Sequence, residues 1–278
     1  MCKTHAGAGM NVCRVLAKAP NSDAPFAYST TVNYNCCTLV ARMRSRHFSS
    51  FLLGVVVLAA VAVSPVRAQM LKGDPAEEFG VRIGRLKYGG GGDWYNNPSS
   101  IPNWASELER RVGIPTNKEE KVVSLTDENL RAFPFIYMTG HGTIRLSPEE
   151  RDNLRAYLED GGFLMINDSY GMDGAVRAMV RDLFPEHPLE ELPNDHPVFH
   201  SFYDLPGLPK IHEHDGKTPQ AFGVTIDGRL VLFYDYESDI GDGLADPDVH
   251  HDPPAKRELA MKMAINVMVY ALTRFVMS

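Results

Sequence analysis

The segment from Phe135 to Gly142 constrains the fold more than any other part of this chain. A short apolar run, Phe-Ile-Tyr-Met-Thr, leads directly into Gly140, His141 and a second glycine. The pattern is typical of a buried parallel strand that ends in a sharp turn, because glycine lets the backbone bend freely. The sequence therefore predicts an α/β protein that presents His141 at the carboxyl edge of its sheet.

An apolar run at residues 51–63 has basic residues before it and small or apolar residues, Val66 and Ala68, after it. This order is typical of a secretory signal peptide. A transmembrane anchor is the alternative, but about 20 apolar residues are needed to cross a bilayer. We therefore expect residues 43–68 to be a signal peptide and the mature protein to be periplasmic or secreted. Only an uncleaved signal segment would contact the membrane.

Residues 1–42 show no apolar period and precede a segment that normally opens an exported chain. We expect them to be a non-native upstream extension, with Met43 as the true start. The cysteines all lie in this region, at positions 2, 13, 36 and 37. Residues 69–278 therefore form a cysteine-free mature chain, in which disulfides and a thiolate nucleophile are excluded.

The formal net charge of -7 is not accompanied by a basic stripe. A protein that neutralises phosphates needs such a stripe, so nucleic acid is not an expected partner. Small molecules or cell-envelope proteins are the partners that we expect instead.

Strand and helix patterns alternate along residues 69–278, which we expect to form a single α/β domain. Residues 80–87 alternate apolar and basic side chains, as a strand with one solvated face would. Asp227 and Gly228 predict a hairpin turn, and residues 185–219 form an irregular insertion. The other expected strands are 121–125, 133–138, 162–167, 222–226 and 229–234, and the expected helices are 101–112, 147–161, 174–184 and 254–275. This alternation predicts a doubly wound, mostly parallel sheet with a C-terminal hairpin and helix.

Ligands in such folds bind outside the carboxyl ends of the strands, so the loops at these ends are candidate binding elements. In the glycine-rich loop after the first strand, aromatic faces beside a carboxylate suit sugars or peptides. A purely structural role, in which the tryptophan covers the end of the sheet, is the alternative. The candidate ligand-binding residues are Gly90, Asp93, Trp94, Tyr95, Gly140, Gly142 and Asp235.

His141 is the first catalytic candidate, as a general base, a metal ligand or a donor to a ligand. The alternative is a histidine that bonds neighbouring loops. Asp168 ends the next strand and Ser169 follows it. An acid that orients His141, with Ser169 or Thr139 as the nucleophile, resembles part of a hydrolytic triad. No Gly-x-Ser-x-Gly motif surrounds Ser169, and Asp168 could instead cap the following helix.

Histidines gather in the irregular insertion, at His196 and His200 and again at His212 and His214. Imidazoles and carboxylates at this density can bind zinc or another divalent ion, so these four residues are candidate metal ligands. His212 and His214 would point the same way on an extended segment. No established metal-binding spacing is present, so solvated polar loops remain the alternative.

An acidic tract follows the last expected strand, from Asp235 to Asp248. It lacks the twelve-residue pattern of an EF-hand, so we expect a solvated loop in preference to a calcium site. Residues 250–252, His-His-Asp, could extend the histidine cluster of the insertion.

Four segments carry a resemblance to a known family, because their glycine-bearing motifs share its order and intervals. The segments are residues 87–94, 137–142, 161–168 and 192–197. Over about residues 79–275 the chain resembles the bacterial family called domain of unknown function 4159. That family is similar to the class I glutamine amidotransferase-like superfamily, which implies a flavodoxin-like or class I amidotransferase-like fold. The nucleophile elbow of active members falls near residues 139–141, where this chain has no cysteine, so their activity is not expected.

The leading hypothesis is an exported domain that binds a small ligand or protein partner at the carboxyl edge without turnover. The alternative is a hydrolase, possibly metal-assisted, that uses His141 and Asp168. A third hypothesis treats the domain as a cell-envelope assembly module.

Expression of the whole sequence in a secreting bacterium should yield a mature chain that begins at Gln69. Ala68→Asp should leave the precursor uncleaved, because signal cleavage requires a small residue at that position. Intact-mass measurement of the soluble exported fraction checks both outcomes. A full-length chain that stays in the membrane fraction would favour the anchor.

Overall fold

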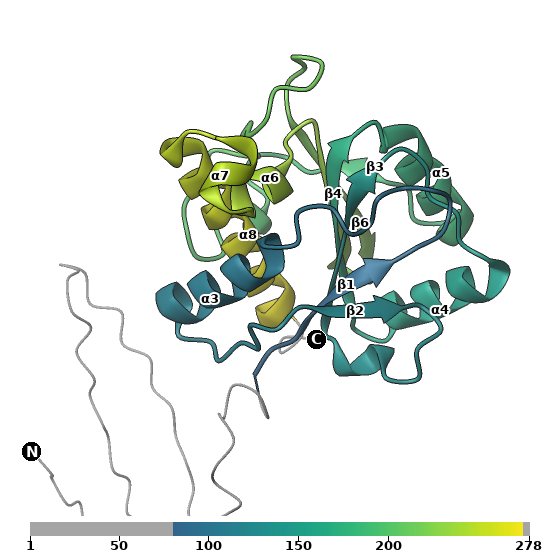
Figure 1. Ribbon diagram of the computed structural model, residues 1–278. Helices are drawn as coiled ribbons and strands as arrows, with labels where there is room; N and C mark the ends of the chain where they lie inside the picture. Colours follow the sequence, from purple (N-terminus) through teal and green to yellow (C-terminus); the bar gives the residue numbers. More distant parts are fainter. Residues whose placement is uncertain (1–79, 275–278) are drawn as a thin grey trace, which may run out of the picture. The chain divides into compact units, whose positions relative to one another are not determined.

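The computed structural model describes residues 80–274. The expected upstream extension, residues 1–42, and the expected signal peptide, residues 43–68, lie outside the described residues. A central sheet runs through the described part, with helices on both of its faces (Figure 1). Among these helices, none has the length and apolar character needed to cross a membrane.

The described strands form one seven-stranded sheet in the order β2-β1-β3-β4-β7-β6-β5. The strands are β1 (Ile83–Lys87), β2 (Lys121–Ser124), β3 (Phe135–His141), β4 (Phe163–Tyr170), β5 (Glu190–Glu191), β6 (Gln220–Ile226) and β7 (Arg229–Tyr236). All pairs from β2 to β7 are parallel, whereas β6 and β5 are antiparallel to their neighbours. The expected mostly parallel sheet and the β6–β7 hairpin are confirmed. The strand order reverses at β1, so the crevice between β1 and β3 is a topological switch point.

Two helical layers cover the sheet. The helices are α3 (Ser100–Val112), α4 (Pro148–Glu159), α5 (Asp173–Leu183), α6 (Ile240–Leu244), α7 (Pro247–His250) and α8 (Pro254–Arg274), with short 3-10 helices η1 (Leu130–Ala132) and η2 (Pro197–Phe199). α3, α6 and α8 lie on one face, and α4 and α5 on the other (Figure 1). Alternate residues of β3 enter opposite cores, because successive strand side chains point to opposite faces.

The start of α4 shows that local sequence signals set the element boundaries. The Ser147 side chain accepts a hydrogen bond from the Glu150 N–H, and the Glu150 carboxylate accepts one from the Ser147 N–H. Pro148 occupies the first turn, where its missing N–H has no intrahelical partner to lose. The capping box expected from the sequence is therefore confirmed.

Arg85 corrects the expectation that β1 has one solvated face. Its side chain is fully buried, as are those of its neighbours Ile83 and Leu86. The guanidinium donates to the carbonyl oxygens of Asn96, at 2.8 Å, and Asn97, at 3.0 Å. It also donates to the Glu120 carboxylate, 2.8 Å away. These acceptors replace water, so a basic residue at an interior position is tolerated, and β1 is buried on both faces.

The acidic tract after β7 is also not the solvated loop that we expected. It forms α6 and α7, and the residues Asp235, Glu237, Asp239 and Asp242 are at most 5% exposed. Asp246 and Asp248 are exposed, as expected. The Asp235 carboxylate accepts a hydrogen bond from the Asp168 N–H, and the Asp239 carboxylate caps α6. Backbone donors at the carboxyl edge thus draw these acids into the interior.

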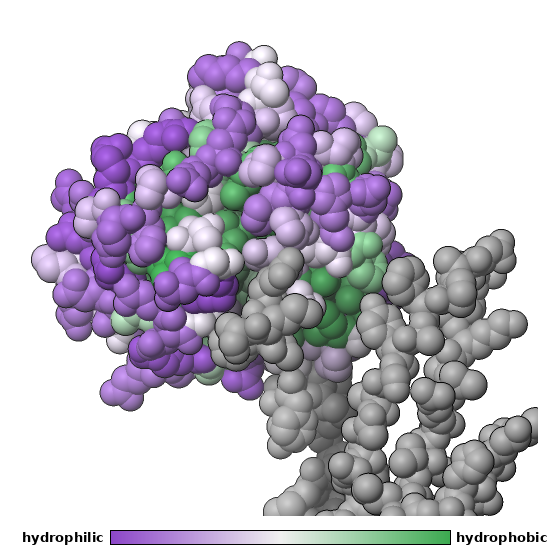
Figure 2. Space-filling view, turned by 180° about the vertical axis from the view of Figure 1, so that it is seen from behind, coloured by the Kyte–Doolittle hydropathy of each residue, from purple (hydrophilic) through white to green (hydrophobic). Residues whose placement is uncertain are grey.

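The surface seen from behind is mostly hydrophilic, with apolar residues showing in hollows between polar ones (Figure 2). Large apolar side chains that are exposed lie on separate elements. They are Tyr95, Val122, Tyr170, Phe202, Val249 and Leu259. Single exposed apolar residues are common on soluble domains, so they do not by themselves define a binding face.

Arg85→Lys should lower the free energy of unfolding by about 3 kcal/mol, because a lysine cannot replace the several bonds of the buried guanidinium. Urea denaturation measures the change. Arg131→Lys is the matched control, since that arginine is 67% exposed and pairs with Asp160 at the surface. Equal midpoints for the two variants would contradict the importance of the buried guanidinium.

Candidate functional site

A cavity of about 370 Å³ opens where the carboxyl ends of β3 and β4 meet the irregular insertion and α6. Its lining consists of Asn96, His141, Ser169, Tyr170, His212, Glu213, His214, Asp242 and His250. Cavities of about 450 and 460 Å³ elsewhere have no histidine in their lining. Chemistry therefore singles out this cavity more clearly than size does. It unites four of the residues expected from the sequence, namely His141, Ser169, His212 and His214.

His141 stands at the end of β3, with 49% of its side chain exposed. Its Nδ1 lies 2.9 Å from Oδ2 of Asp93, and its backbone N–H donates to the same carboxylate. When the neutral ring donates from Nδ1, Nε2 keeps its lone pair and can act as a base or a ligand. Asp93 thus orients the imidazole.

Gly140 makes this arrangement possible. Its φ is 144°, and a Cβ at this position would lie 2.4 Å from the Tyr88 hydroxyl and 3.1 Å from Asp93 Oδ1. A side chain here would displace the loop that carries Asp93. The glycine before His141 is therefore a requirement of the close approach between the β1 and β3 loops.

Asp168 does not pair with His141. Its carboxylate is buried, accepting hydrogen bonds from the Met172 N–H, at 3.1 Å, and the Tyr234 hydroxyl, at 3.0 Å. Burial raises the pKa of Asp168 above its ordinary value. The Met172 N–H belongs to the N-cap residue of α5, so Asp168 secures the turn that precedes this helix without being its N-cap. The carboxylate beside His141 is Asp93, in the loop that follows the adjacent parallel strand β1, and this position was the available signal.

Ser169 is 3% exposed, and its hydroxyl belongs to a polar network. Oγ lies 3.0 Å from the Thr139 hydroxyl and accepts hydrogen bonds from the side-chain amides of Asn96 and Asn167. Among the described residues its hydrogen-bond partners are amides and a hydroxyl, so no imidazole is bonded to take its proton. This environment holds Ser169 as part of the cavity wall.

Asn167 links that wall to α6, which the sequence gave no reason to expect. Its Nδ2 donates to Oδ1 of Asp239 at 3.0 Å, and its Oδ1 accepts from the Gly241 N–H at 2.6 Å. A Cβ at Gly241 would meet the Asn167 amide at 2.8 Å. The β4 terminus and the start of α6 are therefore held in direct contact.

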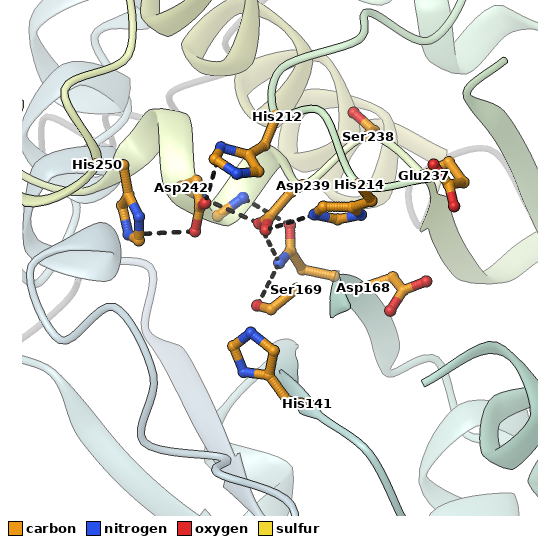
Figure 3. A network of polar contacts seen from close by, with 12 residues as sticks. His141, Asp168, Ser169, His212, His214, Glu237, Ser238, Asp239, Asp242 and His250 are labelled. Carbon is orange, nitrogen blue, oxygen red and sulfur yellow. Dashed lines mark hydrogen bonds and ion pairs between the residues drawn. The ribbon is translucent and has the colours of Figure 1, made fainter. Parts of the chain in front are cut away.

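Asp239 and His214 form a buried ion pair at the wall of the cavity, and Figure 3 shows their contact. Their side chains are 1% and 4% exposed, and His214 Nε2 lies 3.3 Å from Asp239 Oδ2. Burial raises the pKa of Asp239 to about 6. Burial opposes protonation of His214, but the bond to Asp239 outweighs it, so the pKa of His214 lies above its ordinary value.

A second group of ionisable side chains borders the cavity beside this pair. His212 Nδ1 lies 3.6 Å from Asp242 Oδ2 and 3.8 Å from Asp252 Oδ1. His250 Nε2 lies 3.2 Å from the other oxygen of Asp242. Figure 3 shows the side chains of His212 and His250 both turned toward Asp242. One atom each from His212, Asp242 and Asp252 lies within 4.8 Å of the others, so this group could hold a metal ion.

His196 and His200, the other two candidate metal ligands, make their contacts elsewhere. His196 Nδ1 accepts from the Val198 N–H at the start of η2, and its ring lies 5.6 Å from that of Tyr270. His200 is bonded to Asp204 and to a backbone carbonyl. Neither lines the cavity, so the structure separates them from His212 and His214.

The remaining candidate ligand-binding residues surround the first loop. Tyr95 is 63% exposed, and the Trp94 ring packs edge-on against it. A Cβ at Gly90 would lie 2.7 Å from the Arg145 backbone nitrogen, whereas one at Gly142 would meet open space. Asp235 is fully buried below the rim, where it holds the Asp168 N–H.

The fold and this cavity define a class of protein, namely an α/β domain with a pocket of histidines and carboxylates at the carboxyl edge of a mostly parallel sheet. The family model described as "Domain of unknown function (DUF4159)" matches residues 82–272. The chain belongs to that family, which confirms the family inferred from its motifs. No protein of curated function matches it.

Protein stability should fall as the pH rises above about 4, the ordinary pKa of a carboxyl group, because burial raises the pKa values of Asp168 and Asp235. The folded state then binds more protons than the unfolded state does. The stabilising contribution is complete below the unfolded pKa and is lost as the pH passes the raised folded values. Urea denaturation across this range measures the slope.

Asp235→Asn should reduce that slope, because it removes one of the raised carboxyl groups. Asp248→Asn is the control, since Asp248 is exposed on α7 and should leave the slope unchanged. A slope that is as steep in Asp235→Asn as in the wild type would contradict the assignment.

Proposed function

We propose that this domain is exported and binds a small polar ligand in the cavity at the carboxyl edge, without turnover. The observation that carries the proposal is that His141, His212, His214 and His250 line one open cavity of about 370 Å³. Small-ligand pockets are commonly about 300–1,000 Å³. The histidines come from β3, the insertion and α7, so the tertiary fold is needed to assemble them.

The lining favours a ligand with both donors and acceptors. Imidazoles can donate or accept, whereas the ionised carboxylates of Asp242 and Glu213 act only as acceptors. Tyr170, 48% exposed, adds an aromatic surface, and its ring meets the His214 ring edge-on with centroids 5.2 Å apart. Hydroxyl-rich or amide-rich molecules such as sugars and short peptides fit this mixture.

Binding without turnover is supported by the state of the catalytic candidates. The Asp168 carboxylate is bonded to Met172 and Tyr234, and the Ser169 hydroxyl is bonded to side-chain amides. A hydrolase, possibly metal-assisted, is the second candidate. The observation in its favour is the Asp93–His141 pair, because an oriented imidazole at a cavity can deprotonate a water molecule.

The superfamily placement is also part of this proposal. The parallel strands follow the order β2-β1-β3-β4-β7, which corresponds to the flavodoxin-like order of doubly wound sheets. The β3 turn at residues 139–141 lies where active class I amidotransferases carry a cysteine, and this chain has threonine, glycine and histidine there. We therefore propose that the domain has a fold related to that of class I amidotransferases but a different function.

The proposed location, periplasmic or secreted, depends on the sequence pattern around residues 51–63. A cell-envelope protein is the alternative ligand, since an exported domain meets such proteins directly. Pull-down with envelope proteins distinguishes the two, because a small-molecule receptor retains no specific protein partner through this cavity.

His141→Ala should weaken ligand binding by about 10- to 100-fold, because a lost hydrogen bond to a charged or polar partner costs about 1.5–3 kcal/mol. A screen of sugars, amino acids and short peptides by ligand-observed NMR identifies the ligand, and calorimetry measures its affinity. His187→Ala is the matched control, since His187 lies against Phe184, away from the cavity.

Equal affinity in His141→Ala and the wild type would contradict the proposed pocket. Chemical conversion of the bound compound by the wild type, with loss of conversion in His141→Ala, would favour the hydrolase.

A further inference from the structure

We propose that His212, Asp242 and Asp252 form a divalent-cation site at the wall of the cavity. The site would use His212 Nδ1, Asp242 Oδ2 and the Asp252 carboxylate. It goes beyond the proposed ligand binding, because a cation can occupy these three groups whether or not the cavity holds an organic ligand.

The spacing of the three groups is that of metal ligands. His212 Nδ1 lies 3.6 Å from Asp242 Oδ2 and 3.8 Å from Asp252 Oδ1. Both distances exceed the usual hydrogen-bond limit of about 3.2 Å. Ligands bound to one cation at about 2.0–2.2 Å stand roughly 3–3.6 Å apart in tetrahedral or octahedral geometry. The three ligand atoms lie within 4.8 Å of one another, so the groups stand wider than a coordination shell, and side-chain adjustments would close it.

Asp252 provides the independent observation that a ligand belongs here. Its side chain is 7% exposed, and Oδ2 is buried without a hydrogen-bond partner among the described residues. A buried carboxylate that lacks a donor or a cation carries an uncompensated desolvation cost. Since His212 is too distant to form a hydrogen bond with it, a bound cation would supply the missing partner.

Asp242 is already positioned for this role. Its Oδ1 accepts a hydrogen bond from the Asn97 amide at 2.8 Å and lies 3.2 Å from His250 Nε2. The opposite oxygen, Oδ2, is the one nearest His212. Carboxylates that bind metals are commonly fixed in this way by hydrogen bonds to the oxygen that is not the ligand.

The insertion is also held in place at this point. The backbone N–H groups of Ile211 and His212 both donate to the Ser238 carbonyl at 3.1 Å. Of the three proposed ligands, His212 lies in the insertion, Asp242 in α6, and Asp252 in the short segment between α7 and α8. A cation bound by all three would therefore link segments that are distant in the sequence.

The donor set indicates which cations the site would accept. One imidazole nitrogen and two carboxylates suit Zn²⁺ or another first-row transition metal better than Mg²⁺ or Ca²⁺, which favour oxygen ligands alone. Three protein ligands leave a further position open, as in many zinc sites that bind water or substrate. Because His212 and Asp242 line the cavity, that position would face it.

Zinc titration of the full chain, purified without a histidine tag and stripped with EDTA, tests the proposal. Calorimetry and elemental analysis should find one high-affinity Zn²⁺ per chain. Asp252→Asn and Asp242→Asn should each weaken binding by at least about 10-fold. Asp248→Asn is the matched control, since this exposed acid on α7 is near in sequence but is not a proposed ligand, and it should bind zinc as the wild type does.

Thermal unfolding keeps the test decisive if a variant folds poorly. In EDTA, Asp252→Asn should unfold at the same temperature as the wild type or higher, because it removes a buried carboxylate whose Oδ2 has no hydrogen-bond partner among the described residues. Added zinc should raise the unfolding temperature of the wild type but not of this variant. Substoichiometric zinc in the wild type, or equal zinc affinity in Asp252→Asn, would overturn the proposal.

His141→Ala separates this proposal from the ligand-binding one. This variant should keep its zinc, because His141 is bonded to Asp93 and is not among the three proposed ligands. If Asp252→Asn loses zinc binding but still binds the organic ligand, the two sites are independent. If His141→Ala loses the organic ligand but keeps its zinc, the same conclusion holds, so failure of one proposal can be told from failure of the other.

Discussion

The buried guanidinium of Arg85 is the interaction on which the arrangement of the site depends. It is fully desolvated in β1 and is bonded to the carbonyl oxygens of Asn96 and Asn97 and to the Glu120 carboxylate. It therefore holds the end of the loop that contains Asn96 and Asn97. The glycine run of the same loop is bonded by the Arg145 N–H and the Thr143 hydroxyl. Three residues of this loop, Asp93 and the two asparagines, then bond a histidine of β3, a serine of β4 and an aspartate of α6.

The buried carboxyl groups at the carboxyl edge of the sheet differ in the partners that they have. An interior carboxyl group must be protonated, hydrogen-bonded or paired with a cation. Asp168 and Asp235 receive backbone hydrogen bonds and secure the strand ends, whereas Asp239 is paired with His214. Oδ2 is buried without a hydrogen-bond partner among the described residues in both Asp235 and Asp252. Asp235 lies within the core, whereas the Asp252 carboxylate lies 3.8 Å from His212 Nδ1, where we propose the cation.

The sequence predicted the parts of the fold that depend on neighbouring residues. The Ser147 capping box and the Asp227 hairpin turn were read correctly, because each signal lies within a few residues. The approximate position of β3 was also correct, although it extends through His141. The site was predicted only in part. His141 was placed at the strand edge, but its partner was taken to be Asp168, since adjacent strand ends allowed several pairings. Asp168 instead accepts hydrogen bonds from the Met172 N–H and the Tyr234 hydroxyl, and Asp93 lies beside the His141 ring.

The sequence by itself determined the alternation of strands and helices, the absence of a thiol from residues 69–278, and the family motifs. These follow from local periodicity, turn chemistry and composition, which need no knowledge of distant contacts. Only the tertiary structure decided that Arg85 is buried and that the acidic tract folds inward. It also decided that His212, Asp242 and Asp252 lie within 4.8 Å of one another. The physical reason is that desolvation and pairing depend on which segments meet in space, and residues up to 40 positions apart carry no local sign of that meeting.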